Sequence, residues 1–159
     1  MASIIDLILV AVVLFGLAIG GFVLHEVFDQ ANDKIQVSNL GTDSKAFNAT
    51  QNAKYPTMLD NFFLILFVGL GLAVFIGAFF LQSHPVFFIF AVIILGFIVI
   101  IAAILGNAYE EFVGNEEFSA VEANYTVIPF VFNNFVTVIA VIGFLLMIGL
   151  FAKTRGEAY

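Results

Sequence analysis

The chain of 159 residues contains no cysteine and no tryptophan, and only five of its residues are Lys or Arg. Without cysteine, the chain has no disulfide, no thiolate metal ligand and no cysteine nucleophile. Twelve acidic residues outnumber the five basic ones, so the chain lacks the positive surface that nucleic-acid binding requires. These absences exclude nucleic acid as a partner and thiol chemistry as an activity.

Charge is also missing from a long internal stretch, because no Asp, Glu, Lys or Arg lies between Asp60 and Glu110. A helix needs roughly 20 apolar residues to cross the hydrocarbon core of a bilayer. The stretch holds two such runs, separated only by the polar sequence Gln82-Ser83-His84-Pro85. It therefore predicts a tight transmembrane hairpin.

The hairpin lacks the ionisable groups that mark chemistry inside a membrane. The chain also has no phosphate loop, nucleophile motif or metal-ligand cluster, so we expect neither an enzyme nor a bound cofactor.

What is present is apolar: 62% of the residues are hydrophobic and the mean hydropathy is +1.11. A soluble domain of this length could not bury so much apolar surface. We predict an all-α integral membrane protein, in which residues 1–159 form one domain of four transmembrane helices. Both termini then lie on one side of the membrane and the two longer connections on the other. The predicted spans are 4–28, 57–82, 85–106 and 129–152.

The first helix is expected to extend beyond the membrane to about residue 37. Its apolar residues recur at helical spacing after His25, while charged and amide side chains occupy the other faces. The Ser-, Thr- and Asn-rich segment after Gly41 ends this helix, and Tyr55 and Pro56 mark the start of the second span. The apolar stripe predicts contact with residues 38–56, with the 107–128 connection or with a partner protein. Its members are Leu24, Val27, Phe28, Ala31 and Ile35.

The connection between the third and fourth spans is acidic, with no Lys or Arg from Asn107 to Ile128. We expect it to contribute to a surface that contacts partner subunits. The residues assigned to this surface are Glu110, Glu111, Glu116 and Glu117.

Two groups of residues within the spans are candidates for contacts between helices. Polar side chains near the membrane surface form hydrogen bonds between helices, and a site for an ion or a lipid headgroup is the alternative. This group is Asp60, Asn61, Asn133 and Asn134. Glycines let helices approach closely, either within the chain or at a neighbouring subunit. This group is Gly16, Gly20, Gly69, Gly71 and Gly77.

Three of the four tyrosines lie next to the predicted span ends on the side of the long connections. They are Tyr55, Tyr109 and Tyr125. This position is typical of an aromatic belt at the membrane interface.

The layout resembles that of the small multi-span membrane proteins of icosahedral viruses and phages that carry an internal lipid membrane. The residues behind this resemblance are the anchor beginning at Asp6-Leu7-Ile8-Leu9, its polar continuation from His25 to Gln36, and the Phe-rich hairpin. The resemblance implies a structural protein that links the bilayer to a protein shell or to neighbouring subunits. It implies lipid and capsid-like subunits as partners, and the internal membrane of a virion as a location.

Two other functions stay open. Holin-like pore-forming proteins are also short and multi-span, but many have a strongly basic C-terminal tail, for which this chain offers only Lys153 and Arg155. A small subunit of a transporter or channel is expected to carry a charged residue at membrane depth. The second, third and fourth spans contain none deeper than Asp60.

Overall fold

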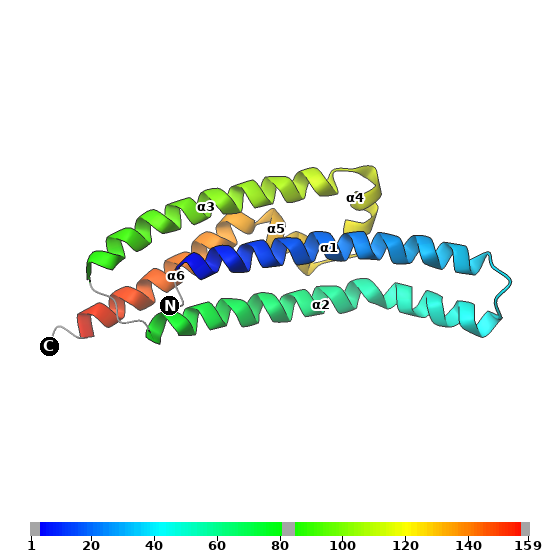
Figure 1. Cartoon of the computed structure of the whole chain (residues 1–159), viewed down its shortest axis with the longest axis horizontal. Coiled ribbons are helices and arrows are strands. Elements are labelled where there is room, and N and C mark those ends of the chain that lie inside the picture. The colour runs from blue at the N-terminus through cyan, green and yellow to red at the C-terminus, as the bar shows by residue number, and fades with distance from the viewer. Residues whose placement is uncertain (1–3, 81–84, 157–159) are drawn as a thin grey trace.

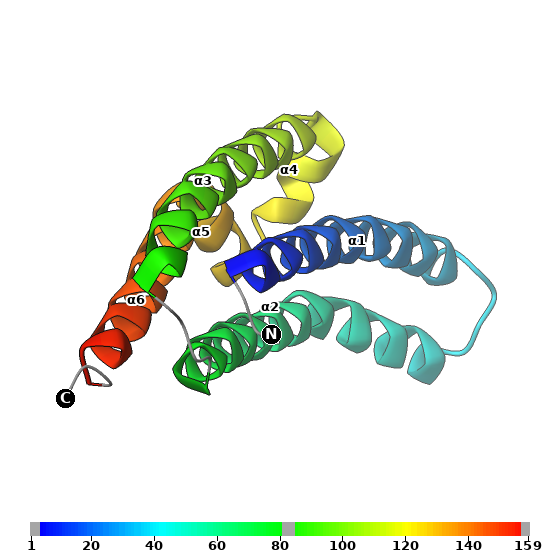
Figure 2. The same ribbon diagram turned by 60° about the vertical axis from the view of Figure 1, so that its left-hand side comes forward.

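The computed structural model describes residues 4–80 and 85–156, and all regular structure in these two segments is helical. Four long helices run side by side as an elongated bundle, while two short helices lie near the end of the bundle that α3 reaches at its C-terminus (Figures 1 and 2). The all-α prediction is therefore confirmed. The helices are α1 (Ile4–Gln36), α2 (Thr42–Phe80), α3 (Pro85–Val113), α4 (Glu116–Glu122), α5 (Val127–Asn133) and α6 (Phe135–Gly156).

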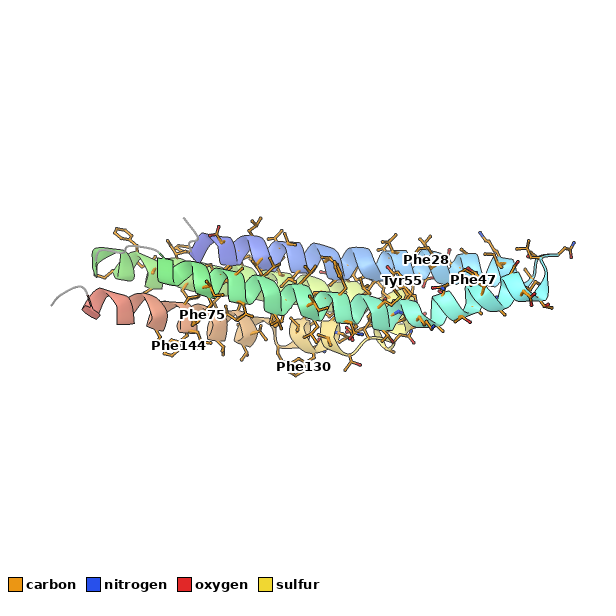
Figure 3. The ribbon with its side chains drawn as sticks, turned by 90° about the horizontal axis from the view of Figure 1, so that it is seen from below. Phe28, Phe47, Tyr55, Phe75, Phe130 and Phe144 are labelled. Carbon is orange, nitrogen blue, oxygen red and sulfur yellow. The ribbon has the colours of Figure 1, made fainter. Side chains whose placement is uncertain are left out.

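Within the described residues, three segments are long and apolar enough to cross a membrane: Asp6–Gln36, Thr42–Gly77 and Ile89–Val113. The α5–α6 pair meets the same criterion as a fourth, although its two helices are bent by 78° at the break between them. The outer surface of the bundle is also apolar, and Ile65, Ile104 and Phe144 are each more than 60% exposed (Phe144 is labelled in Figure 3). A surface of this kind is costly in water. The helices thus have the lengths and compositions of a multi-pass membrane protein with three or four spans.

The core of the bundle contains an aromatic cluster, in which Phe132 of α5 contacts four other rings. Its ring stacks on those of Tyr109 and Phe135, each with a centroid distance of 4.7 Å. The rings of Phe63 and Phe15 contact it at 6.0 and 6.1 Å. Such pairs contribute about 0.5–1.5 kcal/mol each beyond the burial of their area. Because α1, α2, α3 and α6 each contribute one ring, the position of Phe132 links all four long helices.

The expected extension of α1 is confirmed, because the helix continues to Gln36. Its partner is the N-terminal part of α2, and together residues 25–36 and 42–56 form an antiparallel pair that we call the head hairpin (Figure 1, at the right). Asn48 donates a hydrogen bond to Asn32 Oδ1 at 3.2 Å, and Asn52 donates one to Asp29 Oδ1 at 2.7 Å. The two helices of the head hairpin are therefore joined by amide and carboxylate side chains.

The apolar stripe on α1 is only partly covered by this pairing. Ile35 is half-buried, whereas Val27 and Phe28 remain 55% and 49% exposed and Ala31 is exposed. One edge of the Phe28 ring does contact Tyr55 of α2, at a centroid distance of 5.2 Å (Figure 3). Contact with residues 38–56 thus accounts for part of the stripe and leaves the rest available.

The start of α2 differs from the expectation. We expected a span beginning at Thr57 after a non-helical segment, but α2 begins at Thr42 and continues through Pro56. Proline removes one backbone donor and usually breaks or kinks a helix. Here the residues before Pro56 are held against α1 by the contacts of Asn48 and Asn52. Tertiary pairing therefore holds this polar segment against α1 and lets the helix continue to Pro56 and beyond.

The ends of the third and fourth predicted spans also differ. The third helix continues beyond Gly106 to Val113, because the additional turns bury Tyr109 and Val113. The fourth is not one helix over 129–152 but α5 and α6, separated at Asn134. The tight connection expected between the second and third spans falls on residues 81–84, which lie outside the described residues.

The glycines that lie closest to other helices are not those expected. A Cβ atom at Gly21 would overlap the side chain of Leu59, and one at Gly143 would overlap Leu95, so α1–α2 and α3–α6 approach closely there. Close packing within the chain, one of the two alternatives for these glycines, is not found at four positions, where no atom outside the local helix backbone lies within 4 Å of an added Cβ. These are Gly16, Gly20, Gly69 and Gly71. Contact of these four with a neighbouring subunit stays a prediction. Gly77 is half-buried near the end of α2.

The head hairpin predicts slow amide exchange over residues 43–54, which the sequence alone would have assigned to a loop. Replacing Asn52 by Ala removes the bond to Asp29 and should speed exchange across the hairpin about fivefold, corresponding to about 1 kcal/mol. Gln51→Ala is the control, because Gln51 is an exposed amide side chain one residue earlier on the same helix. Hydrogen–deuterium exchange of the protein in nanodiscs measures both. Exchange of 43–54 at the rate of an unstructured chain would contradict the helical hairpin.

Candidate functional site

The candidate site is built around Asp60 of α2, whose side chain is buried with only 8% exposed. Its carboxylate accepts three backbone hydrogen bonds from the start of α5. The N–H groups of Thr126 and Val127 donate to Oδ2 at 2.8 Å each, and that of Ile128 donates to Oδ1 at 2.9 Å. A side chain from another helix thus performs the role that an N-cap residue normally has.

The donors at this helix start are fully accounted for. The first amides of a helix have no partner within the helix. Asp60 takes those of residues 126–128, Pro129 has no N–H, and Phe130 N–H donates to Thr126 O at 3.3 Å. The side chain of Thr126, although in the N-cap position, makes no capping bond. The negative charge of Asp60 also lies at the positive end of the helix dipole, which stabilises it further.

Tyr125, which immediately precedes the capped amides, connects the same region to α1. Its hydroxyl lies 3.1 Å from Nδ1 of His25, and both residues are buried. Burial raises the pKa of the Tyr125 phenol well above its ordinary range, so the hydroxyl keeps its proton. The ring of Tyr55 from α2 lies 5.5 Å from that of His25, and its hydroxyl donates to Gly21 O at 3.4 Å.

A third contact ties α3 to α4 in the same part of the bundle. The hydroxyl of Tyr109 donates to Glu122 Oε1 at 2.9 Å, while the Tyr109 ring stacks on Phe132. The ring of Phe22 lies against Tyr109 at 6.1 Å and against Tyr125 at 4.7 Å, and so links this contact to the previous one. We call the whole set the polar cluster; its members are His25, Tyr55, Asp60, Tyr109, Glu122 and Tyr125.

The polar cluster joins helices rather than presenting free groups. Both carboxylate oxygens of Asp60 are occupied by amide donors, so an ion would have to displace backbone hydrogen bonds to reach them. Within residues 4–80 and 85–156, no three His, Cys, Asp or Glu side chains are grouped as a metal would need. The hydrogen bonds of the polar cluster therefore hold α1, α2, α3, α4 and the start of α5 together.

The other polar residues expected at this level do not join the cluster. Asn61, Asn133 and Asn134 are all exposed, and the Asn134 amide donates to Phe130 O one turn earlier at 2.9 Å. Asn134 instead marks the break between α5 and α6. Of the four residues predicted to link helices, Asp60 alone is seen to do so in the described part of the chain, and its partners are backbone amides.

Sequence reasoning missed the role of the tyrosines and of His25. Tyr109 and Tyr125 are buried and Tyr55 is half-buried, so they do not form the exposed interfacial belt that their positions suggested. A buried tyrosine usually finds a hydrogen-bond partner. The only signal in the sequence is that each tyrosine lies within five residues of an acidic residue. The acidic residues of the connection are exposed as expected; they are Glu110, Glu111, Glu116 and Glu117.

The fold and the polar cluster define a class rather than a particular protein. The class is an all-helical bundle with the apolar outer surface of a multi-pass membrane protein, fastened at one end by buried polar contacts. Comparisons with family models, with curated protein sequences and with solved structures give no match. The function is therefore inferred from the geometry of the chain itself.

Replacing Asp60 by Ala should destabilise the bundle by about 3 kcal/mol, because it leaves three amides at the start of α5 without acceptors. Asp60→Asn should cost less, about 1–2 kcal/mol, because one amide oxygen can still accept. The control is Asn61→Ala, an exposed neighbour whose replacement should stay within about 0.5 kcal/mol. Unfolding in mixed detergent micelles measures all three. Equal effects of Asp60→Ala and Asn61→Ala would show that the capping contact does not hold α5.

Proposed function

We propose that this chain is a structural integral membrane protein of a larger assembly, and that it acts through packing rather than through catalysis or transport. In this proposal α1, α2, α3 and the α5–α6 pair cross the membrane. The proposal is supported by the three apolar helices of spanning length and by the exposed apolar side chains along the bundle.

In this proposal, one surface of the membrane lies at the level of the polar cluster. From Asp60 to Phe80, α2 has about 20 residues, enough to cross a hydrocarbon core of about 30 Å at 1.5 Å per residue. His25, Tyr109 and Tyr125 belong to the same cluster and so lie at the same level. The head hairpin then projects about 15–20 Å into water, by the same rise per residue over its α1 part. The beginning of α1 and the end of α6 lie at the opposite end of the bundle (Figure 1).

The observation that best supports the proposal is the location of the buried polar side chains. A path for ions needs favourable polar stations through the hydrocarbon region. In the described interior, the fully buried side chains between the cluster and the far end are apolar. They include Leu7, Leu14, Ile98, Ile139 and Leu146. The buried polar groups gather instead at one end, where they bond to one another and to backbone amides.

Within this class we propose a virion membrane protein that links a lipid bilayer to a protein shell or to neighbouring subunits. The support is the resemblance in layout described above, together with the head hairpin and the exposed acidic end of α3 and α4. These extramembrane parts lie at the same end of the bundle (Figures 1 and 2). They offer one face to a protein layer beside the membrane, while the apolar bundle remains in lipid.

The test is reconstitution of the purified chain into liposomes. We expect the protein to resist extraction by alkaline carbonate, because the apolar bundle is inserted, and to leave proton and sodium gradients intact. Rapid collapse of either gradient at a low protein-to-lipid ratio would contradict the proposal and favour the pore-forming alternative. Complete extraction by carbonate would contradict membrane insertion.

A further inference from the structure

The head end of the molecule carries almost all of the net charge. Nine acidic and three basic side chains belong to the head hairpin, the end of α3 and α4, which places there six of the seven net negative charges of the chain. The acidic residues are Glu26, Asp29, Asp33, Asp43, Glu110, Glu111, Glu116, Glu117 and Glu122, and the basic ones are Lys34, Lys45 and Lys54. A surface of this sign attracts cationic partners and repels nucleic acid and anionic lipid.

The tip of the head hairpin also has an open cleft with a volume of about 450 Å³. Its walls are apolar at Ile35, Leu40 and Phe47, and Asp43 places a carboxylate on it. Phe47 is 66% exposed, and Val37 in the adjoining turn is 85% exposed (Phe47 is labelled in Figure 3). The cleft thus combines apolar walls with one acidic group.

The fold of the hairpin does not require these exposed apolar side chains. The tip is already closed by two hydrogen bonds, from Lys45 Nζ to Gln36 O at 2.7 Å and from Gln36 Nε2 to Lys45 O at 3.0 Å. Charged residues surround the segment on both helices, so it cannot lie in hydrocarbon. Large apolar groups that are exposed to water without a role in the fold mark a contact surface.

We propose that the tip cleft binds a basic segment of a partner protein in the assembly. An apolar side chain of the partner fills the space between Ile35, Leu40 and Phe47, and a neighbouring Lys or Arg pairs with Asp43. The net negative head favours the approach of such a segment and raises its association rate. This inference rests on the proposed function, because it assigns the chemistry of the partner that the head contacts.

A second copy of this chain is a poorer occupant on the same grounds. Two heads would bring together surfaces that each carry six net negative charges, and like-charge contacts cost affinity. Lys45, which follows the cleft residue Ser44 in sequence, donates a hydrogen bond from its amine to the Gln36 carbonyl and is therefore engaged within the hairpin.

The test uses the full chain in phosphatidylcholine nanodiscs and three short synthetic peptides of equal length. One combines Lys and Arg with Leu and Phe, the second replaces the cations with Glu, and the third replaces the apolar residues with Ser. Fluorescence anisotropy at physiological salt should show binding of the first peptide, and at least tenfold weaker binding of the other two, a difference of about 1.4 kcal/mol.

Variants locate the binding. Phe47→Ser and Asp43→Lys should each weaken the first peptide by about tenfold or more. Glu117→Lys changes the net charge by the same amount as Asp43→Lys but lies on α4, and should weaken binding by about threefold or less. Equal losses for Asp43→Lys and Glu117→Lys would overturn the inference in favour of non-specific attraction.

Other outcomes also decide the matter. Failure of the wild-type chain to bind the first peptide, or preference for the Glu peptide, would overturn the inference. Self-association in nanodiscs that Phe47→Ser abolishes would assign the cleft to a second copy instead. If liposome gradients stay intact but no peptide binds, the inference fails and the proposed function stands. If the proton or sodium gradient leaks but the peptide binds normally, the proposed function alone fails.

Discussion

The structure depends most on the bond between the Asp60 carboxylate and the amides that begin α5. An ionised carboxylate is costly to bury unless hydrogen bonds replace its water. Three N–H donors do so here, at 2.8 to 2.9 Å, and they come from a segment 66 to 68 residues later in the chain. The contact fixes where α5 begins and therefore brings Phe132 into the aromatic core. Because Phe132 contacts rings from all four long helices, the cap positions a residue at which all four helices meet.

The same contact explains why the last apolar segment is broken. Once the start of α5 is held by α2 and Phe132 is held by the core, α6 must leave at Asn134 with a bend of 78° to pack along α3. The polar cluster around this point joins five parts of the chain and leaves no carboxylate oxygen of Asp60 open. In the proposed membrane setting, the bundle is thus fastened at one surface, and the head hairpin is held at a fixed direction beyond it.

Much of the fold followed from sequence patterns because long apolar helices are read directly from apolar runs. The lengths of the apolar stretches predicted the long helices, and the spacing of Val27, Phe28, Ala31 and Ile35 predicted that α1 continues to Gln36. The early start of α2 could not be read in the same way. Residues 42–55 lack an apolar run and Pro56 follows them, so the sequence did not indicate a helix, and the pairing with Asn32 and Asp29 leaves no mark in it.

The candidate site was less predictable for a related reason. Asp60 was recognised as a polar residue that links helices, but its partners are backbone amides, which leave no mark in the side-chain sequence. Tyr109 and Tyr125 looked like interfacial residues because position along a span says nothing about which face a ring occupies. Gly21 and Gly143 lie at the close helix contacts, whereas the spaced Gly16 and Gly20 face open space. Pattern alone cannot tell which side of a helix meets its neighbour.

The most direct test of this account is a long-range NMR correlation through the hydrogen bonds to Asp60. In deuterated protein in micelles, scalar couplings across hydrogen bonds should connect the amide nitrogens of Thr126, Val127 and Ile128 to the carboxyl carbon of the Asp60 side chain. Correlations from these three amides, which vanish in Asp60→Ala while those within α1 persist, are the predicted result. Assignment of the three amides to another acceptor, or their rapid exchange with water in the wild-type protein, would contradict it.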